Sequence, residues 1–246
     1  RGAVTIDEER DYHFRYVLED NFGNRRTYQF IVKGKRQDIP EYKPEANEML
    51  YWNRTNVIQK PGIELVVPRY HVYENVPLRT DMRGDSSRIA FDYILDAGRT
   101  PIHSYCDLSI GLRHMPVADT TKYYIVQKAG KWRSSMGGKY ANGWIKTRVR
   151  SLGTFSVDVD TIAPQITPIG QGGWRTSRNI RFRIKDMESG IGSYKVYIDG
   201  KFVLFGLKKG ILVIQNPEKV KKGVPHKLEV TVTDQCGNMA RKEYKF

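Results

Sequence analysis

With 246 residues, the chain can form one large β-domain or two to three small ones, each with a core of its own. A composition of 39% hydrophobic, 28% charged and 11% aromatic residues excludes a disordered chain, and the lack of a run of about 18 apolar residues excludes a membrane-spanning helix. The net charge of +14 is compatible with a polyanionic partner, but charges on the outward positions of strands explain it more simply.

The first predicted element is a β-hairpin. In FRYVLEDNFGN (14–24), apolar residues alternate before an Asp-x-x-Gly-Asn turn, and LEVTVTDQCGN (228–238) repeats this pattern. Each copy is followed by Tyr-x-Phe, so we predict that each is the last hairpin of a sandwich domain. Few residues precede the first copy, and the segment 1–38 is therefore predicted to be the C-terminal remnant of a first β-sandwich.

Strand patterns dominate the remaining chain, and helix is expected to be scarce. PEANEMLYW (44–52) favours one short helical turn. Period-two alternation predicts strands at 88–98, 121–132, 153–160 and 180–186. We expect two hairpins after these strands, one at 193–205 that turns at Asp199-Gly200 and one across 205–214.

The stretch DTIAP (160–164) lies between two predicted strands and is expected to be a short extended joint between domains. Pro164 disfavours helix at the residue before it and cannot donate a hydrogen bond to a sheet. The predicted fold class is therefore all-β, with tandem immunoglobulin-like β-sandwich modules and very little helix. The domain boundaries are placed at 1–38, 39–160 and 161–246.

The sequence offers little metal or thiol chemistry. Cys106 and Cys236 are too few for a disulfide scaffold and are expected to be small buried side chains. His103 and Asp107 have His-x-x-x-Asp spacing, but no two of the five histidines form His-x-His, so we expect a capped loop and a strand start. KDMESGIGS (185–193) holds two carboxylates in a turn, which is too few for a dedicated calcium site.

Aromatic residues give the only candidate ligand surface. Trp132, Tyr140 and Trp144 occur together in KWRSSMGGKYANGW, a segment rich in Gly and Ser. Their amphipathic rings are suited to stacking on a glycan or a peptide. The alternative is that Trp132 and Trp144 cover the end of a sandwich core, which we favour.

Three longer phrases resemble the C-terminal regions of cell-envelope zinc metallopeptidases of the lysostaphin and LytM type from Bacteroidetes. They are ERDYHFRYVLEDNFGN, GWIKTRVRSLGTFSVDVDTIAPQITPI and DMESGIGSYKVYIDGKFVL. The resemblance implies that β-domains follow a catalytic domain whose zinc is held by His-x-x-x-Asp and His-x-His elements. Because this chain lacks that set, no catalytic residue is assigned, no cofactor is expected here, and zinc is expected only in the absent catalytic domain.

The resemblance implies a non-catalytic accessory region, in the periplasm or outside the cell, that positions or shields its own upstream catalytic domain. Peptidoglycan and envelope polyanions are the expected partners. The alternative is a carbohydrate- or surface-binding adhesion module without an enzyme. Nucleic acid is disfavoured because no recognition motif accompanies the basic residues. We expect any targeting segment to lie upstream, because RGAVTIDEER has neither a basic nor an apolar leader.

Overall fold

A computed structural model describes residues 4–36, 45–85, 87–98 and 100–246 of the chain. About 52% of the structure is strand and 6% is helix, which confirms the predicted all-β sandwich fold with little helix. The chain divides into two compact units, Arg1–Lys43 and Pro44–Phe246. In the described part of the chain, the α-helix is a single turn of four residues, far shorter than a helix that crosses a bilayer.

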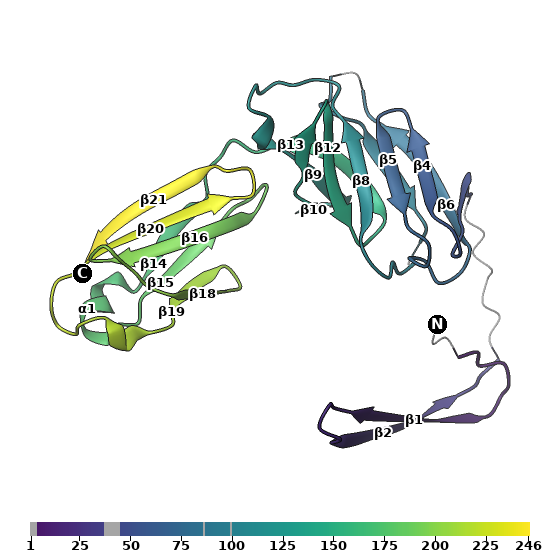
Figure 1. Ribbon diagram of the computed structural model, residues 1–246, viewed down its shortest axis with the longest axis horizontal. Coiled ribbons are helices and arrows are strands. Elements are labelled where there is room, and N and C mark those ends of the chain that lie inside the picture. Colours follow the sequence, from purple (N-terminus) through teal and green to yellow (C-terminus); the bar gives the residue numbers. More distant parts are fainter. Residues whose placement is uncertain (1–3, 37–44, 86, 99) are drawn as a thin grey trace. The chain divides into compact units, whose positions relative to one another are not determined.

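The first unit contains a two-stranded antiparallel sheet (Figure 1). Strand β1 (Asp11–Glu19) pairs along its whole length with β2 (Arg25–Lys33), and Phe14 lies opposite Phe30. The Asp-x-x-Gly-Asn turn joins the two strands as predicted, because the side chain of Asp20 accepts hydrogen bonds from the backbone of the turn that follows it.

The second unit begins with a two-layer sandwich over residues 48–159. Its sheets have the orders β10-β9-β13-β7-β6-β3 and β11-β12-β8-β5-β4. The strands are β3 (Glu48–Leu50), β4 (Asn56–Lys60), β5 (Ile63–Val67), β6 (Val76–Arg83), β7 (Asp92–Asp96), β8 (Cys106–Gly111), β9 (Tyr123–Ala129), β10 (Trp132–Ser135), β11 (Lys139–Ala141), β12 (Trp144–Val149) and β13 (Gly153–Val159), with a 3₁₀ turn at Thr120–Lys122. Alternate side chains of both sheets, such as Leu65, Leu108 and Phe155, meet in one core.

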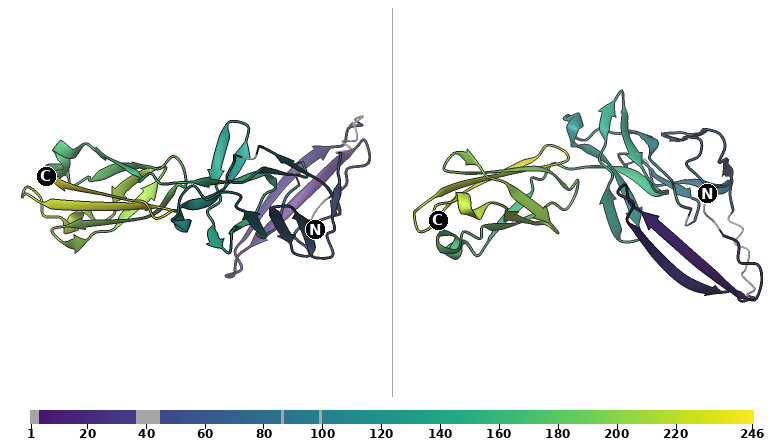
Figure 2. Two further views of the ribbon diagram at one scale, coloured as in Figure 1. Left: turned by 90° about the horizontal axis from the view of Figure 1, so that it is seen from above. Right: turned by 60° about the horizontal axis from the view of Figure 1, so that its bottom comes forward.

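The C-terminal sandwich has two four-stranded sheets, with orders β14-β15-β19-β18 and β17-β16-β20-β21, and Figure 2 gives two further views of them. This order is the immunoglobulin-like arrangement, in which the first two strands pair with a later hairpin and the last hairpin joins the middle strands. The elements are β14 (Gln165–Ile169), α1 (Trp174–Ser177), β15 (Arg181–Lys185), β16 (Ile191–Ile198), β17 (Lys201–Phe202), β18 (Phe205–Lys208), β19 (Ile211–Ile214), β20 (Lys227–Asp234) and β21 (Met239–Lys245), with 3₁₀ turns at Gln171–Gly173 and Pro217–Lys219.

Both predicted C-terminal hairpins are confirmed. Asp199 and Gly200 have φ angles of 51° and 76°, and Lys209 and Gly210 have 50° and 74°, so both turns use two left-handed residues. Such turns match the twist of the strands that they join. The predicted helical turn at 44–52 is wrong over the described residues 45–52, because Glu48–Leu50 pairs with β6 and buries Leu50 completely.

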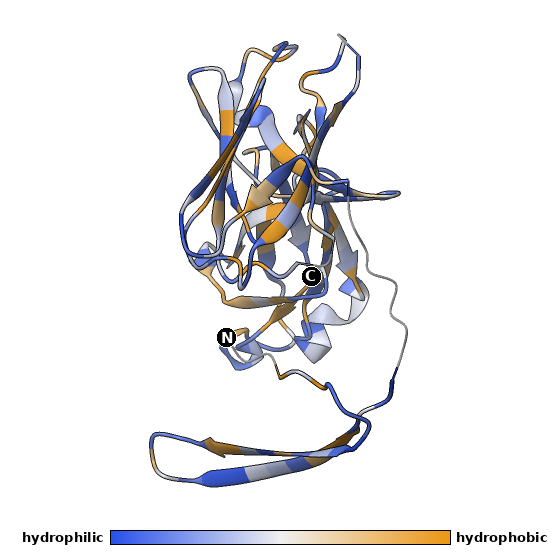
Figure 3. Cartoon of the chain, turned by 90° about the vertical axis from the view of Figure 1, so that its right-hand side faces the viewer, coloured by the Kyte–Doolittle hydropathy of each residue, from blue (hydrophilic) through white to orange (hydrophobic). Residues whose placement is uncertain are grey.

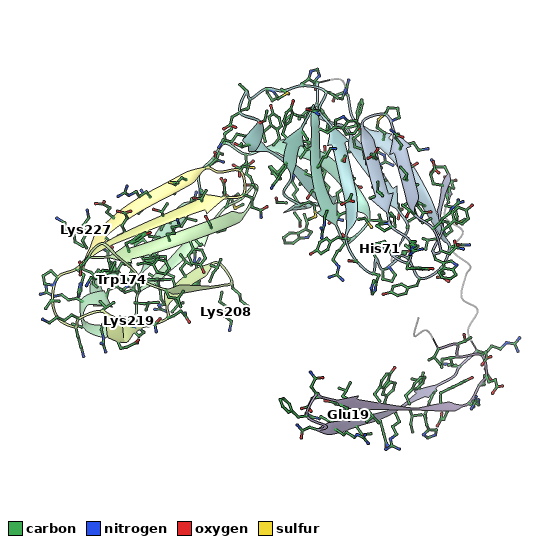
Figure 4. All side chains as sticks on the ribbon, in the orientation of Figure 1. Glu19, His71, Trp174, Lys208, Lys219 and Lys227 are labelled. Atoms are coloured by element: carbon green, nitrogen blue, oxygen red, sulfur yellow. The ribbon has the colours of Figure 1, made fainter. Side chains whose placement is uncertain are left out.

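Trp174 occupies the centre of the C-terminal core, in the interior of the domain in Figure 4. Its ring meets Phe182, Tyr244 and Phe246 edge-on, with centroids 5.0 to 5.8 Å away. The indole Nε1 donates a 2.9 Å hydrogen bond to the carbonyl oxygen of Ile169, so the ring is fully buried without an unpaired polar atom.

The side chain of His226 links the loop that leads into β20 to the turn at Asp199 through hydrogen bonds. Its Nδ1 lies 2.6 Å from Oδ2 of Asp199 and its Nε2 lies 2.7 Å from the carbonyl oxygen of Lys221. Two acceptors require two N–H donors, which the imidazolium form provides. Burial opposes this charge, but the bond to Asp199 and the Lys221 carbonyl outweigh it and raise the pKa of His226, and the bond from His226 lowers the pKa of Asp199.

We expect the C-terminal sandwich to lose stability as the pH rises past the raised pKa of His226. The contribution is fully present below the unfolded pKa of about 6.5 and disappears as the folded ring loses its proton. Asp199→Asn tolerates the left-handed backbone but removes the charge. It should lower the free energy of unfolding by about 1 kcal/mol near pH 5.5, a modest amount because Asp199 is half-exposed. Near pH 9 the loss should be much smaller, because His226 then carries no charge to pair with. Denaturant titrations that follow NMR signals of this sandwich measure the difference, and equal losses at both pH values would contradict it.

Candidate functional site at the joint between the sandwiches

Asp160 connects the two sandwiches of the second unit. It directly follows β13, and its backbone N–H donates to the carbonyl oxygen of Lys122 in the first of the two sandwiches. Its side chain reaches the other sandwich and is fully buried. A buried carboxylate is costly unless hydrogen bonds or opposite charges satisfy it, so its partners determine what the joint can do.

Four hydrogen bonds satisfy this carboxylate. Oδ2 accepts from the backbone N–H of Ser189 at 3.0 Å and from its hydroxyl at 2.5 Å. Oδ1 accepts from the backbone N–H of Ile162 at 2.9 Å and from Nδ2 of Asn238 at 3.3 Å. A carboxylate has about four acceptor positions, so all of them are in use.

Asn238 extends the joint to the last turn of the chain. Its Nδ2 donates to the carbonyl oxygen of Asp160 at 3.0 Å and to Oδ2 of Asp234 at 2.7 Å. Oδ1 of Asp234 accepts from the backbone N–H groups of Cys236 and Asn238. The Asp-x-x-Gly-Asn turn thus shapes the hairpin and, through its Asn, also binds the preceding sandwich.

Cys236 adds a small apolar contact to the joint. With Tyr124 and Val126 of β9 it forms a buried cluster separate from the two main cores. The Nζ of Lys122 donates a 3.0 Å hydrogen bond to the carbonyl oxygen of Cys236. Burial raises the pKa of the Cys236 thiol to about 11, so the thiol is neutral at physiological pH. Cys106 is also free and buried, which confirms the expected roles of both cysteines.

A third carboxylate, that of Asp186, lies near Asp160 and Asp234. One carboxylate oxygen from each residue falls within 4.8 Å of the others, the only such group of metal-ligand atoms in the described parts of the chain. Burial and the charge of Asp160 raise the pKa of Asp234, although hydrogen bonds from Asn238 act in the opposite direction. Burial and the neighbouring carboxylates likewise raise the pKa of Glu188.

Oxygen ligands of this kind suit Ca²⁺, which takes six to eight of them. However, the four acceptor positions of Asp160 already receive protein donors, and both oxygens of Asp234 also accept hydrogen bonds. Asp186 uses Oδ1 for the backbone N–H groups of Glu188 and Gly190. The carboxylate of Asp160 and its donors on Ile162, Ser189 and Asn238 therefore form a hydrogen-bonded link at the joint between the two sandwiches, here called the latch.

The structure separates the three aromatic residues that were considered as a candidate ligand surface. The favoured alternative, that Trp132 and Trp144 cover the end of a sandwich core, is wrong for Trp132, whose side chain is exposed. Trp132 is 81% exposed on β10, in one sheet of its sandwich, whereas Tyr140 and Trp144 lie on β11 and β12 of the other sheet. Tyr140 pairs with Ile145 and Ala141 pairs with Trp144, so Tyr140 and Trp144 point to opposite faces. No two of these three described rings are in contact, and their role in binding stays a prediction.

Among the residues that the structure describes, His103 and Asp107 do not form a metal site with other ligands. Nδ1 of His103 lies 3.1 Å from the hydroxyl of Tyr73, and the two rings meet edge-on. Asp107 is exposed on β8, opposite Arg148 of β12. The group formed by Asp160, Asp186 and Asp234 was not predicted from the sequence. Each member lies in a segment that the sequence analysis considered: Asp160 starts the DTIAP joint, Asp186 belongs to the turn KDMESGIGS, and Asp234 starts the repeated turn. Nothing in their spacing indicates that they meet.

The comparisons with known proteins bear on the first sandwich of the second unit. Residues 47–160 match the model of a family described as the Zu5-like domain. The match ends at Asp160, the residue that latches this sandwich to the next one. No curated protein gave a match to the chain.

Proposed function

We propose that the chain is a non-catalytic accessory region that positions neighbouring parts of a larger cell-envelope protein, a zinc metallopeptidase of the type that its sequence resembles. The observation that carries the positioning role is the latch at Asp160. Three of the four hydrogen bonds to one buried carboxylate, those from Ser189 and Asn238, together with the contacts of Cys236, link a Zu5-like sandwich to an immunoglobulin-like one.

A positioning role requires a joint that resists bending. Hinges between domains are usually exposed segments with few contacts across them. Here the joint residue is fully buried, and Asn238 ties it to the last hairpin of the chain. The hydrogen bonds from Ser189 and Asn238 cross from one sandwich to the other, so bending would expose the carboxylate and these donors together.

The link to a peptidase rests on the sequence resemblance, and two assays test it. The 246-residue chain with added Zn²⁺ should not cleave peptidoglycan cross-link peptides. The full-length gene product should cleave them and should lose this activity with a chelator. Zinc-dependent cleavage by the chain alone, or a full-length protein without such activity, would overturn the proposal.

A matched pair of variants in the full-length protein tests the positioning role. Asp160→Ala should reduce cleavage of polymeric peptidoglycan more than cleavage of a short soluble peptide. The reason is that only the polymeric substrate requires the domains to keep a fixed position relative to one another. Asp107→Ala removes an exposed carboxylate from the same sandwich and should change neither rate. An Asp160→Ala protein that retains its full rate on the polymer would count against positioning.

A second candidate, binding to an anionic polysaccharide, is favoured by the outer face of the sheet that contains β15. Residues 161–246 contain 16 Lys and Arg against 7 Asp and Glu. Arg181, Arg183 and Lys185 are exposed at alternate positions of β15, and Lys208 lies two strands away, in line with Arg183 through Ile211. Figure 4 shows Lys208 at the edge of this sandwich. Within the described residues, none of these four cations forms an ion pair, so their charge is available to a partner.

Charge reversal on this face tests the second candidate with heparin and polygalacturonate as probes. Arg181→Glu with Arg183→Glu should weaken binding about tenfold at low salt, and binding should decline as salt is added. The control pair, Lys195→Glu with Lys201→Glu, makes the same change in net charge on the other sheet. Equal weakening by both pairs would show a general charge effect and would contradict a dedicated face.

A further inference from the structure

The hairpin β1-β2 carries an aromatic face that the other described residues of its own unit do not cover. Residues that lie opposite each other in the ladder share a face, which places Phe14 beside Phe30 and Tyr16 beside Tyr28. Phe30 stacks on both Phe14 and Tyr16, with ring centroids 5.2 and 5.8 Å apart. Yet Tyr16 is 53% exposed and Leu18 is 58% exposed. Figure 3 shows apolar residues on both strands of this hairpin.

The last hairpin of the chain, β20-β21, has the same turn. In both turns the Asp backbone N–H donates to the Asn carbonyl oxygen, at 3.1 Å each, and the Gly N–H donates back to the Asp carbonyl oxygen. Oδ1 of Asp20 accepts from the N–H groups of Phe22 and Asn24, as Oδ1 of Asp234 does from the corresponding residues. The Asn side chain reaches Oδ2 in both, at 2.8 and 2.7 Å.

The two hairpins also have the same strand register. Phe14 opposite Phe30 corresponds to Leu228 opposite Tyr244, at the same distance in sequence from the turn. The two hairpins are therefore structural copies, and the C-terminal copy shows what the common inner face does. There, the positions equivalent to Phe14, Tyr16 and Leu18 are Leu228, Val230 and Val232, which are fully buried in the core.

The C-terminal copy also shows which strands provide the cover. The sheet β14-β15-β19-β18 lies across the core from β20-β21, and its strands all precede the hairpin in the sequence. An isolated two-stranded hairpin is at best marginally stable in water, and an exposed flat apolar face is prone to association. The aromatic face thus needs an apolar sheet, and the copy places that sheet N-terminal to the hairpin.

We propose that β1-β2 is the closing hairpin of a further immunoglobulin-like sandwich, and that the same polypeptide supplies its covering sheet from the residues immediately N-terminal to Arg1. The tip of the turn agrees with this assignment. Phe22 is 92% exposed, whereas its counterpart Cys236 is buried against the preceding sandwich of its own unit. By analogy, Phe22 would pack against the domain that precedes this further sandwich in the chain.

Hydrogen exchange on two forms of the protein tests this assignment. One form is residues 1–246, and the other is extended N-terminally by about 70 encoded residues, the length of one such sandwich without its last hairpin. Amides of the β1-β2 ladder should gain at least about 100-fold in protection in the extended form, because core strands open only with their domain. Unchanged exchange in the extended form would overturn the proposal.

A variant pair identifies the face involved. In the extended form, Tyr16→Arg should abolish the added protection, whereas Thr27→Arg, on the opposite face of the hairpin, should retain it. Protection that appears only as the concentration of the 1–246 form rises would identify a second copy as the cover and would also overturn the proposal. None of these outcomes depends on peptidase activity, so they are distinguishable from a failure of the proposed function.

Discussion

Replacing Asp160 with Ala is expected to lower the free energy of unfolding of the Pro44–Phe246 unit by about 3 to 5 kcal/mol, the usual cost of removing one side of a buried charged network. The change leaves the N–H groups of Ile162 and Ser189, the Ser189 hydroxyl and the Asn238 amide without their acceptor. Chemical denaturation of the purified chain measures this loss.

The control for this prediction is Asp107→Ala, which removes an exposed carboxylate from a strand of the first sandwich of the same unit. Its effect should stay within about 0.5 kcal/mol, as is usual for surface positions. Asp160→Asn keeps the shape and one acceptor oxygen and should fall between the two. Equal losses for Asp160→Ala and Asp107→Ala would show that the latch does not contribute to stability.

Truncating Trp174 to Ala is expected to cost about 3 to 5 kcal/mol in the C-terminal sandwich, the range measured for large buried aromatic side chains. The indole is fully buried among three aromatic rings, so its loss leaves a cavity that the surrounding strands cannot close. Hydrogen exchange of the amides of β15 and β20 measures the loss in this sandwich separately from the rest of the chain.

The matched control is Trp132→Ala, at a ring that is 81% exposed on β10. It should change stability by less than about 0.5 kcal/mol. If Trp174→Ala left the exchange of β20 unaltered, the aromatic cluster would not be the centre of the core. A stability loss at Trp132 comparable to that at Trp174 would contradict the exposure difference on which both expectations depend.

Local chemistry explains which features were predictable from the sequence. Period-two alternation indicated β9, β13, β15 and β16, because strands with one buried face must alternate. The Asp199-Gly200 step indicated a hairpin, since tight hairpin turns need left-handed residues. The repeated Asp-x-x-Gly-Asn phrase indicated two equivalent turns, because their hydrogen bonds lie within five consecutive residues.

Features that depend on distant partners were missed. The segment 44–52 has the local composition of a helical turn, but Leu50 is buried only because β3 pairs with β6, more than 20 residues later. Trp174 stands in a polar Gly-Gly-Trp-Arg-Thr-Ser context that gave no sign of a core residue. The rings of Trp132, Tyr140 and Trp144 are neighbours in sequence, but strand pairing distributes them over two sheets.

The sequence by itself determined the all-β class, the hairpins and the position of the joint, because each depends on residue types within a few positions of one another. Only the tertiary structure decided that Asp160, Asp186 and Asp234 meet, and that donors from the joint and from two distant loops saturate the first of them. It also decided that the β20-β21 face is covered by its own domain, while the matching face of β1-β2 has no cover within the described residues of its own unit. The physical reason is that burial and hydrogen-bond satisfaction are set by contacts between segments far apart in the chain, which no local pattern specifies.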